Sequence, residues 1–534
     1  MTFANAQNNL LANVIDNNKT DSSAWLSVTN FGVVGDGIQN NTKSLQNAIS
    51  YASKHKRTLY FPPGLYMTNA ITLASDLTIK GEGRNTIIKA ITTTAENYKF
   101  GCVFFSWYNS NYKNITIDNI TLDGNATVFD SSLKAAVVDF SSCSNIFINA
   151  VTIVNSQSVG LALEKCTDVK VINCTFDNFG WSALMAIGVT NAQFIGNKTT
   201  GWSKVNLDIH PAWSFPTLSS RNVTINDNVF FNSSHATEYG IELYGAFSYQ
   251  FTIHNNVLDA NGYKGSGISG AFKFSTIKNN KFLNGTGSQR CGLEVHLDTS
   301  IVSGNIIENG SIASAPFHVV AHSQTGGIIS NNIITNNLTQ GFGIVIAGSG
   351  ALDTTYSFEI SGNTVRTMGN LNSAIMIGWY GAKGNYKGIA VYNNNIYTSI
   401  NTNGIRFHGS SGKDVRVHNN YINGSISGIT NDSNSPITGI FDIANNTVIN
   451  SSTGLAVKTN SKVSTFNNRT NSSWNNTNEV NKEIPNNFFY LSNSSLAPSN
   501  SKDKGTKGEI RVTASYIYMC LDKDKWIRTK ISKW

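Results

Sequence analysis

The chain has 534 residues, a net charge of +8 and only 13% charged side chains. So small a charged fraction, with asparagine, serine, threonine and glycine in its place, excludes charge-rich disorder and does not suit a helical bundle. No stretch approaches the ~18 apolar residues of a membrane span, and the first residues lack the basic and apolar regions of a signal peptide, so we expect neither feature.

The distribution of charged residues and of cysteines does not indicate a nucleic-acid partner, a metal site or a cofactor site. The basic residues of the last 35 positions are mixed with acidic ones, so nucleic acid is not expected as a partner, and an acidic polymer fits the positive charge equally well. The six cysteines form no CxxC pair and no zinc-like spacing. We therefore expect them to be small buried apolar residues, and we expect no metal ion or other cofactor.

The first predicted element is a short helix. In the segment NNTKSLQNAISYASKHK, Thr42 is the predicted N-cap residue, and the helical spacing of the apolar residues places four of them on one face. These four are Leu45, Ala48, Ile49 and Ala52. The segment TLYFPPGLYMT then returns to extended structure. A helix with one apolar face suits the end of a stacked-strand fold, because it covers strand edges that would otherwise be exposed.

A repeated motif, apolar-x-Asn-Asn-x-apolar, dominates the rest of the chain. Clear copies recur every 24 to 31 residues, with the fourth position at 228, 256, 280, 305, 332, 363, 394, 420 and 446. Weaker copies precede them between residues 117 and 200. A second short apolar strand, such as VNLDIH, GIELYG or GLEVHL, follows each copy after a polar turn. Each unit is therefore predicted to consist of two strands.

Neighbouring repeats must stack, because one such unit cannot bury its apolar face alone. Short strands at this period, with no helical pattern between them, predict an all-β fold of the parallel solenoid type. Asparagine side chains at equivalent positions of stacked turns are expected to hydrogen-bond along the axis. A β-propeller is the main competing fold, but its blades need longer repeats of four strands each.

Aligning the second strands by their inward apolar residues places the outward residues in two columns. The first column holds Ala162, Asp208, Glu242, Glu294 and Arg406, and the second holds Glu164, His210, Tyr244, His296 and His408. Stacked strands lie ~4.8 Å apart. Asp208 and Glu242 are predicted on adjacent rungs, with Glu294 two rungs beyond and all three side chains facing solvent. Like charges stacked in this way repel, so a solenoid built only for stability would not choose them.

Two carboxyl groups this close suit the hydrolysis of a glycosidic bond. One acid protonates the leaving oxygen and the other activates water or attacks the sugar, with ~5 to 5.5 Å between the groups for retention and ~6.5 to 9.5 Å for inversion. Asp208 and Glu242 are the predicted catalytic pair, which can reach either range, and Glu294 is the substitute member. The predicted substrate-binding residues are His210, Tyr244, His296, Arg406, His408, Trp379 and Tyr380. Histidines can orient carboxylates or move protons.

Residues 28 to 66 carry a resemblance to a known family. The segment VTNFGVVGDGIQNNTKSLQNAISYASKHKRTLYFPPGLY resembles the entry of the pectate-lyase-like right-handed parallel β-helix proteins, in particular bacteriophage tailspikes and capsule depolymerases. The resemblance covers roughly residues 25 to 470, and the C-terminal segment GTKGEIRVTASYIYMCLDKDKWIRTKISKW resembles a β module of phage tail proteins. The sequence departs from the family pattern because it does not include the long virion-anchoring domain that often precedes such a helix, so we expect either that the sequence is trimmed or that the attachment element lies elsewhere.

The resemblance implies four regions and an assembly. These are a neck segment at 1–27, a capping helix with the first rungs at 28–90, a parallel β-helix with a glycan-binding face at 91–470, and a C-terminal β or trimerisation module at 471–534. It also implies a homotrimer on the virion tail that acts outside the cell, at the host surface. Its expected partners are a bacterial capsular polysaccharide and phage tail or baseplate proteins.

The expected function is endo-acting hydrolysis of that polysaccharide, and two alternatives stay open. One is a lyase that cleaves a uronic-acid polymer by β-elimination, with His210 or Tyr244 as the base. The other is a non-catalytic glycan-binding protein. An esterase is a fourth and weaker hypothesis, because the sequence has no evident GxSxG motif for a nucleophilic serine. The sequence does not determine the sugar repeat, the linkage, the host, retention versus inversion, or whether one subunit or two form the site.

Overall fold

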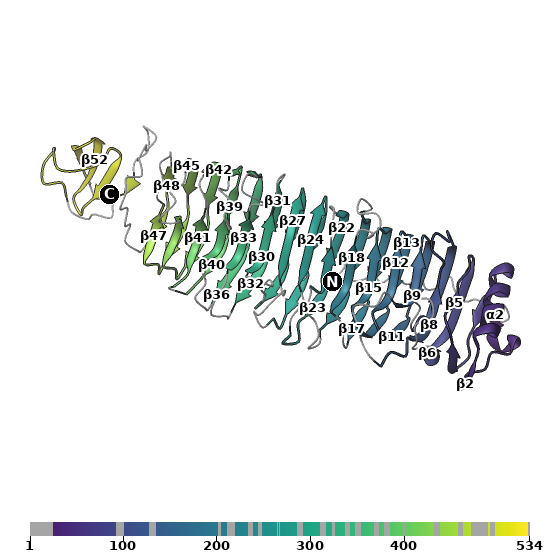
Figure 1. Ribbon diagram of the computed structural model, residues 1–534. Coiled ribbons are helices and arrows are strands. Elements are labelled where there is room, and N and C mark those ends of the chain that lie inside the picture. The colour runs from purple at the N-terminus through teal and green to yellow at the C-terminus, as the bar shows by residue number, and fades with distance from the viewer. Residues whose placement is uncertain are drawn as a thin grey trace.

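The computed structural model describes residues 25–91, 101–127, 135–200, 204–210, 219–232, 239–243, 248–263, 265, 267–285, 292–309, 317–322, 326–336, 342–347, 354–367, 373–378, 385–399, 401–408, 411–431, 438–457, 463–470, 490–491 and 497–531. Within these residues, 49 strands join one sheet that winds along a single axis (Figure 1). Their pairing is parallel, so the predicted right-handed parallel β-helix is confirmed.

Each full turn of the solenoid contributes one strand to each of three stacks. The first stack comprises β5 (Ile71–Thr72), β7 (Phe104–Phe105), β9 (Ala136–Ser141), β12 (Val159–Glu164), β15 (Ser182–Ile187), β18 (Val205–His210), β21 (Ile241–Leu243), β24 (Ile268–Lys273), β27 (Leu293–Asp298), β30 (Phe317–His322), β33 (Phe342–Ala347), β37 (Ser373–Ile377), β41 (Asn403–Phe407), β44 (Ser427–Asn431) and β47 (Thr453–Ala456).

The second stack comprises β10 (Ser144–Asn149), β13 (Thr167–Ile172), β16 (Thr190–Ile195), β19 (Arg221–Asn226), β22 (Ser248–His254), β25 (Thr276–Lys278), β28 (Ser300–Ser303), β31 (Gly327–Ser330), β35 (Phe358–Ser361), β39 (Ala390–Tyr392), β42 (Ser411–His418), β45 (Thr438–Ala444) and β48 (Val463–Phe466). The third comprises β11 (Thr152–Ser156), β14 (Thr175–Phe179), β17 (Lys198–Thr200), β20 (Val229–Phe231), β23 (Val257–Asp259), β26 (Lys281–Leu283), β29 (Ile306–Glu308), β32 (Ile333–Asn336), β36 (Thr364–Thr367), β40 (Asn395–Tyr397), β43 (Tyr421–Asn423), β46 (Thr447–Ile449) and β49 (Arg469–Thr470).

The prediction of two strands per unit is wrong, because the repeated motif itself contains a bend. In INDNVF, β19 ends at Asn226 and β20 begins at Val229. Between them, Asp227 has a φ of 56°, a left-handed conformation that Asn, Asp and Gly adopt more readily than other residues. Strands as short as β20 contain too few residues for their alternation to be recognised in the sequence.

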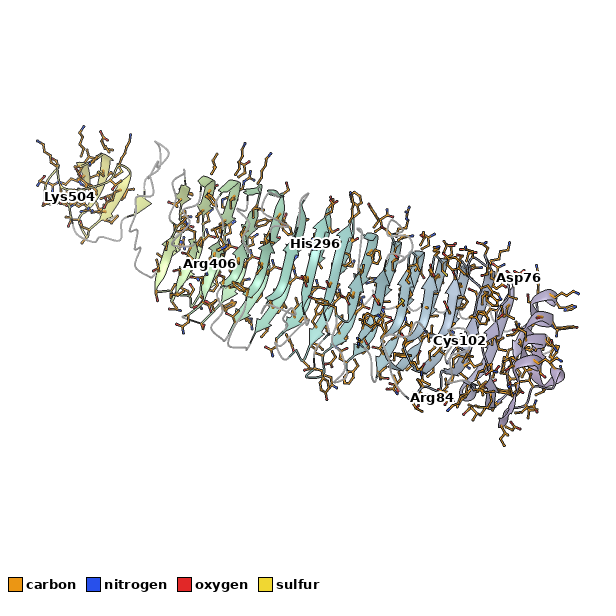
Figure 2. The ribbon with its side chains drawn as sticks, in the orientation of Figure 1. Asp76, Arg84, Cys102, His296, Arg406 and Lys504 are labelled. Carbon is orange, nitrogen blue, oxygen red and sulfur yellow. The ribbon has the colours of Figure 1, made fainter. Side chains whose placement is uncertain are left out.

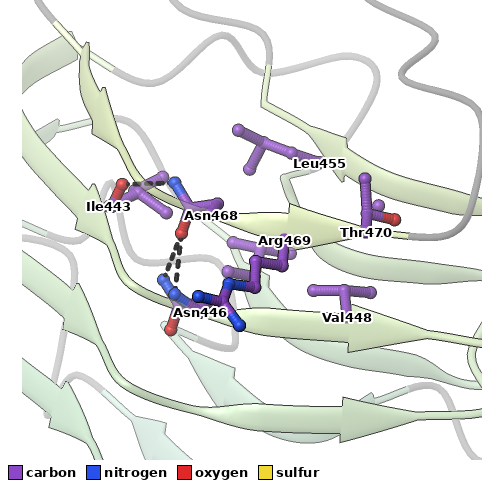
Figure 3. A pocket seen from close by; sticks show the side chains of 9 residues that line it. Ile443, Asn446, Val448, Leu455, Asn468, Arg469 and Thr470 are labelled. Carbon is purple, nitrogen blue, oxygen red and sulfur yellow. Dashed lines mark hydrogen bonds between the residues drawn. The ribbon is translucent and has the colours of Figure 1, made fainter. Parts of the chain in front are cut away.

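The predicted asparagine ladder is confirmed. Asn228 donates through Nδ2 to Oδ1 of Asn256 at 2.9 Å and to the carbonyl of Phe194 at 2.9 Å, and its backbone N–H donates to the same Oδ1 at 3.0 Å. The same pattern links all nine predicted positions, each of them buried. Figure 3 shows the last step, in which Asn446 donates to Asn468. The ladder satisfies polar groups that would otherwise be buried without partners.

The helix α2 (Thr42–His55) covers the N-terminal end of the solenoid (Figure 1). Its buried residues are Leu45, Ala48, Ile49 and Ala52, which is the predicted face. The prediction of Thr42 as N-cap is wrong by one position, since Asn41 is the N-cap residue and makes no side-chain capping bond. The Asn41 side chain instead holds the preceding loop, through bonds of 2.8 and 2.9 Å to the backbone N–H and carbonyl of Val34.

The first turns around α2 are built from η2 (Val28–Phe31), β1 (Trp25–Ser27), β2 (Asp36–Asn40), β3 (Thr58–Tyr60), β4 (Gly64–Thr68), β6 (Leu77–Ala90) and β8 (Lys113–Asp123). Two further strands, β34 (Thr354–Tyr356) and β38 (Asn385–Lys387), extend the corners between the first and second stacks. No helix among the described residues is long and apolar enough to cross a membrane.

Among the described residues, the interior of the solenoid is filled mainly by apolar side chains. Two cavities of about 10 Å³ each lie beside the ladder, one of them lined by Asn446 and Asn468 (Figure 3). The five described cysteines are buried, as predicted, whereas Cys291 lies outside the described residues. Burial raises the pKa of the Cys174 thiol to about 12, which makes it an unreactive packing residue.

A second sheet lies in the predicted C-terminal region. It comprises β50 (Tyr490–Leu491), β51 (Glu509–Val512), β52 (Tyr516–Asp522) and β53 (Lys525–Lys530). The last three strands pair in antiparallel fashion around Tyr518, Cys520 and Trp526. This sheet falls within residues 471–534, where a separate β module was expected. Most of the predicted neck, residues 1–24, lies outside the described residues.

Candidate active site

The first predicted column forms a continuous row on the first stack. Asp208 in β18 pairs with Glu242 in β21, Glu242 pairs with Ser269 in β24, and Ser269 pairs with Glu294 in β27. Asp208 and Glu242 therefore lie on adjacent rungs and Glu294 lies two rungs beyond Glu242, as the alignment predicted. Ala162 belongs to the same row, since it pairs with Met185, which pairs with Asp208.

The two predicted catalytic carboxylates are buried, and the expectation that they face solvent is wrong. Asp208 is 0% exposed and Glu242 is 4% exposed, whereas Glu294 is half-buried. Strand alternation places a side chain on the outer side of a sheet, but it does not reveal which other parts of the chain cover that side. A carboxyl group taken from water into protein needs hydrogen-bond partners. The neighbours of Asp208 and Glu294 supply some of them.

Trp181 fixes the orientation of Asp208. It directly precedes β15, on the rung before Asp208, and its indole Nε1–H donates to Oδ2 of Asp208 at 2.7 Å. The ammonium group of Lys204 lies 5.4 Å from the centroid of the Trp181 ring, within the range of a cation–π interaction. The sequence indicated neither contact, although Trp181 occupies a recognisable place, immediately before the rung that precedes the acid.

Tyr239 plays the same part for Glu294. It is buried just before β21, and its hydroxyl donates to Oε2 of Glu294. Tyr239 thus reaches from the rung of Glu242 to a carboxylate two rungs away. The three carboxylates and two aromatic donors form one acidic cluster, defined here as Asp208, Glu242, Glu294, Trp181 and Tyr239.

His296 adjoins the acidic cluster. It stands two residues after Glu294 in β27, and in the register of the sheet it pairs with His322 in β30. Its ring is exposed at the outer edge, yet the surrounding protein lowers the pKa of His296, and the nearby Glu294 offsets this only in part. His296 is therefore neutral at neutral pH and can accept a proton or donate a hydrogen bond.

Two other predicted binding residues, Arg406 and His408, lie farther from the acidic cluster. Arg406 lies in the row of the first column, four rungs beyond Glu294, and His408 follows it on the same turn. Figure 2 shows Arg406 and His296 on separate turns of the solenoid. Burial lowers the pKa of His408, and the charge of Arg406 lowers it further. A ligand bound at the acidic cluster can therefore contact Arg406 and His408 only if it extends along the solenoid axis.

Part of the predicted site lies outside the described residues. The backbone of His210 pairs with Ile187, which places it in the second column, but its side chain is not described. Tyr244, Trp379 and Tyr380 also lie outside. Among the described residues, no group of three or more His, Cys, Asp or Glu is placed to hold a metal ion.

Three histidines make stability depend on pH. Partial loss of hydration beside the surrounding protein is the main cause that lowers the pKa of His254, His296 and His408 below 6.5 in the folded protein, and His296 is the most exposed of the three. As the pH falls below this value the unfolded chain takes up protons first, so the folded state loses stability until the lowered pKa values are reached. We expect the melting temperature to fall between about pH 7.5 and about pH 5.5. A variant with all three histidines changed to glutamine should show a smaller fall in melting temperature over this pH range. An equal fall in both proteins would contradict the assignment of the pH dependence to these histidines.

Comparison with known proteins finds one matching family model and several solved structures with a similar fold. The family model described as rhamnogalacturonase A/epimerase, pectate lyase-like, matches residues 25–290. No curated protein sequence matches the chain. The bacteriophage phi29 gene product 12 N-terminal fragment is 14% identical, with a TM-score of 0.45 over 87% of this chain and 96% of that one.

Two further solved structures are similar at the same level. The surface adhesin PfbA of Streptococcus pneumoniae is 16% identical, with a TM-score of 0.43 over 81% of this chain and 91% of that one. The A-module of the mannuronan C-5 epimerase AlgE4 of Azotobacter vinelandii is 16% identical, with a TM-score of 0.37 over 84% and 100%. The capping helix and the parallel coil of three-strand turns are those of a parallel β-helix, and the match over residues 25–290 places that part of the chain in the pectate-lyase-like family.

Proposed function

We propose that this protein hydrolyses glycosidic bonds of a polysaccharide, with Asp208 and Glu242 as the catalytic carboxyl pair. The observation that carries the proposal is their pairing across adjacent strands, with both side chains buried. A glycosidase needs two carboxyl groups in one site, an acid that protonates the leaving oxygen and a base or nucleophile, and Asp208 and Glu242 supply two such groups from neighbouring strands.

Glu294 and His296 complete the proposed site. Glu294 is the substitute partner for Glu242, and a pair two rungs apart would suit inversion, because the longer spacing leaves room for water. His296, neutral at neutral pH, would orient the nearby carboxylate or bind a sugar hydroxyl. Trp181 and Tyr239 are positioning residues, since each donates a hydrogen bond to a carboxylate of the acidic cluster.

The proposed substrate is a bacterial capsular polysaccharide, and the proposed place of action is the host surface, with the protein on a virion tail. Support comes from the resemblance of residues 28 to 66 to phage tailspikes and depolymerases. The positive net charge of +8 suits an acidic polymer. The phage tail or baseplate would be the attachment partner.

Digestion of a panel of purified capsular polysaccharides tests this function. Hydrolysis is expected to create new reducing ends on at least one polymer, and NMR of the products identifies the linkage and the anomeric outcome. Ultraviolet-absorbing unsaturated ends would instead identify a lyase. A polymer that is bound but never shortened would identify a glycan-binding protein without catalytic activity.

We further propose that the protein assembles with copies of itself through the C-terminal sheet. One face of this sheet is covered by the Tyr518, Cys520 and Trp526 core. The other face carries Ile510, Val512, Ile517, Met519 and Ile527, which the register places side by side. Val512 is 44% exposed and Ile527 is 46% exposed. Since an uncovered apolar face on a small sheet favours association, three copies packed around one axis would bury it, in line with the homotrimer that the resemblance implies.

Changing Ile527 to Asp is expected to dissociate the assembly. A carboxylate placed in an apolar interface lacks partners, so the dissociation constant should rise at least about tenfold. Light scattering after size-exclusion chromatography measures the change. Lys530→Asp is the matched control, because Lys530 lies on the same strand and pairs with Tyr516 on the opposite face. A monomeric wild-type protein, or an unchanged trimer of the Ile527 variant, would contradict the proposal.

A further inference from the structure

Trp107 and Tyr108 are large aromatic side chains that the fold leaves in solvent. Trp107 is 59% exposed and Tyr108 is 55% exposed. A ring of this size gains free energy from burial, and neither ring belongs to the apolar core of the solenoid. Adjacent exposed aromatic residues of this kind are typical of binding surfaces.

The register places these residues on the face of the acidic cluster. Phe105 in β7 pairs with Asp139 in β9, Asp139 pairs with Ala162, and the row continues through Met185 to Asp208. The backbone N–H of Ser106 donates to the carbonyl of Asp139 at 2.8 Å, so the ladder continues one residue beyond Phe105. Trp107 follows directly, with its ring edge-on to Phe105 at a centroid distance of 5.2 Å. Trp107 thus stands two residues after Phe105, on the N-terminal side of the acidic cluster and four rungs before Asp208.

A charged group borders the aromatic pair. The ammonium group of Lys165 donates to the hydroxyl of Tyr108 at 2.8 Å and lies 4.9 Å from the centre of its ring. The same ammonium group lies 3.9 Å from Oε1 of Glu164, which belongs to the second column. An aromatic face with hydrogen-bond donors and acceptors at its edge matches a sugar ring, which offers apolar C–H groups on one side and hydroxyl groups around its rim.

The distance from this aromatic pair to the acidic cluster fits an extended polymer. Four rungs separate Phe105 from Asp208, which corresponds to about 19 Å along the axis at ~4.8 Å per rung. The row between them carries the half-buried side chains of Asp139, Ala162 and Met185. A glycan chain that lies along the axis would span several sugar units between the two places.

We infer that Trp107 and Tyr108, with Lys165 and Glu164 at their edge, form a remote subsite for the polysaccharide that is cleaved at Asp208 and Glu242. The inference rests on the proposed function, since it assigns the occupant of the subsite as another part of the same polymer. The subsite binds a pyranose ring of the chain by stacking on Trp107, and it holds the polymer along the solenoid axis. It is a binding element and takes no part in bond cleavage.

The test compares the wild-type protein with Trp107→Ala and Trp107→Phe on two lengths of one glycan. The glycan is the capsular polysaccharide that the wild-type protein digests or, if it digests none, the one that it binds. For Trp107→Ala, the KM or the dissociation constant for the polymer is expected to rise at least about fivefold, with kcat changed by less than about twofold. For fragments of two or three sugar units, which cannot span both places, the difference from wild type should vanish. Trp107→Phe should recover most of the affinity.

A matched control is Tyr397→Ala. Tyr397 is 38% exposed on the third stack, away from the proposed path, so its removal should leave polymer binding unchanged. Equal polymer affinity of Trp107→Ala and wild type would overturn the inference, and so would an equal loss on polymer and short fragments. Because binding is measured as well as cleavage, a protein that binds the polymer through Trp107 but never cuts it would disprove the proposed hydrolysis and leave the remote subsite standing.

Discussion

Replacing Glu242 with Gln, or Asp208 with Asn, is expected to slow polysaccharide cleavage by about 10²- to 10⁴-fold, the usual contribution of a general acid or base. Each amide has nearly the shape of the carboxyl group it replaces, so it fits the same buried space. The carbonyl of Asn at position 208 can still accept the hydrogen bond from Trp181, which holds the native Oδ2 at 2.7 Å. New reducing ends on the digested polymer measure the rate.

The burial of the pair makes a folding control necessary. Because Asp208 is 0% and Glu242 is 4% exposed, each variant should be compared with wild type by circular dichroism and by its melting temperature. Asp298→Asn is the matched control, since Asp298 lies in β27 with its side chain 13% exposed and forms an ion pair of 3.1 Å with Lys273. Loss of the Asp298 charge should leave the rate of polysaccharide cleavage unchanged.

The Glu294→Gln variant decides between the two possible pairs. If Asp208→Asn stays active and Glu294→Gln does not, the catalytic pair is Glu242 with Glu294, and the products should be inverted. Full activity of Glu242→Gln on the true substrate would contradict either assignment, because Glu242 belongs to both pairs.

The register of the acidic row was predictable from the sequence because it depends only on alternation. Leu207 and Ile209 flank Asp208, as Ile241 and Leu243 flank Glu242, and inward apolar residues fix which neighbours face outward. Stacking such strands then sets the order of the rungs. The asparagine ladder was predictable for a similar reason, since one polar residue recurs at the same place in each turn.

Burial and hydrogen bonding at the site were not predictable in this way. The side chain of Asp208 is 0% exposed, which alternation does not reveal, and its donor, Trp181, comes from another turn. Tyr239 reaches Glu294 across two rungs, a contact that depends on rotamers and loop paths. The third strand of each turn was missed because three residues, as in β20 (Val229–Phe231), show too little periodicity.

Asn280→Ala is expected to destabilise the middle of the solenoid by at least about 3 kcal/mol, because each buried polar group left without a partner costs about 1–3 kcal/mol. Asn280 is fully buried, and its Oδ1 accepts from the backbone N–H of Asn256 at 3.0 Å and from Nδ2 of Asn256 at 2.9 Å. Its own Nδ2 donates to the carbonyl of Ile253 and to Oδ1 of Asn305, both at 3.0 Å. Alanine removes all four bonds and leaves a gap in the ladder.

The neighbouring asparagine provides the control for this change. Asn279 belongs to the same motif, but it is exposed and has a φ of 55°, so its role is to turn the chain. Asn279→Gly keeps that conformation accessible and should change stability by less than about 0.5 kcal/mol. Since each turn of a solenoid contacts only its neighbours, the loss at Asn280 should be local. Hydrogen exchange should show weakened protection in β22, β25 and β28 around the gap and little change near α2, whereas uniform protection along the axis would mean that the ladder does not hold the turns together.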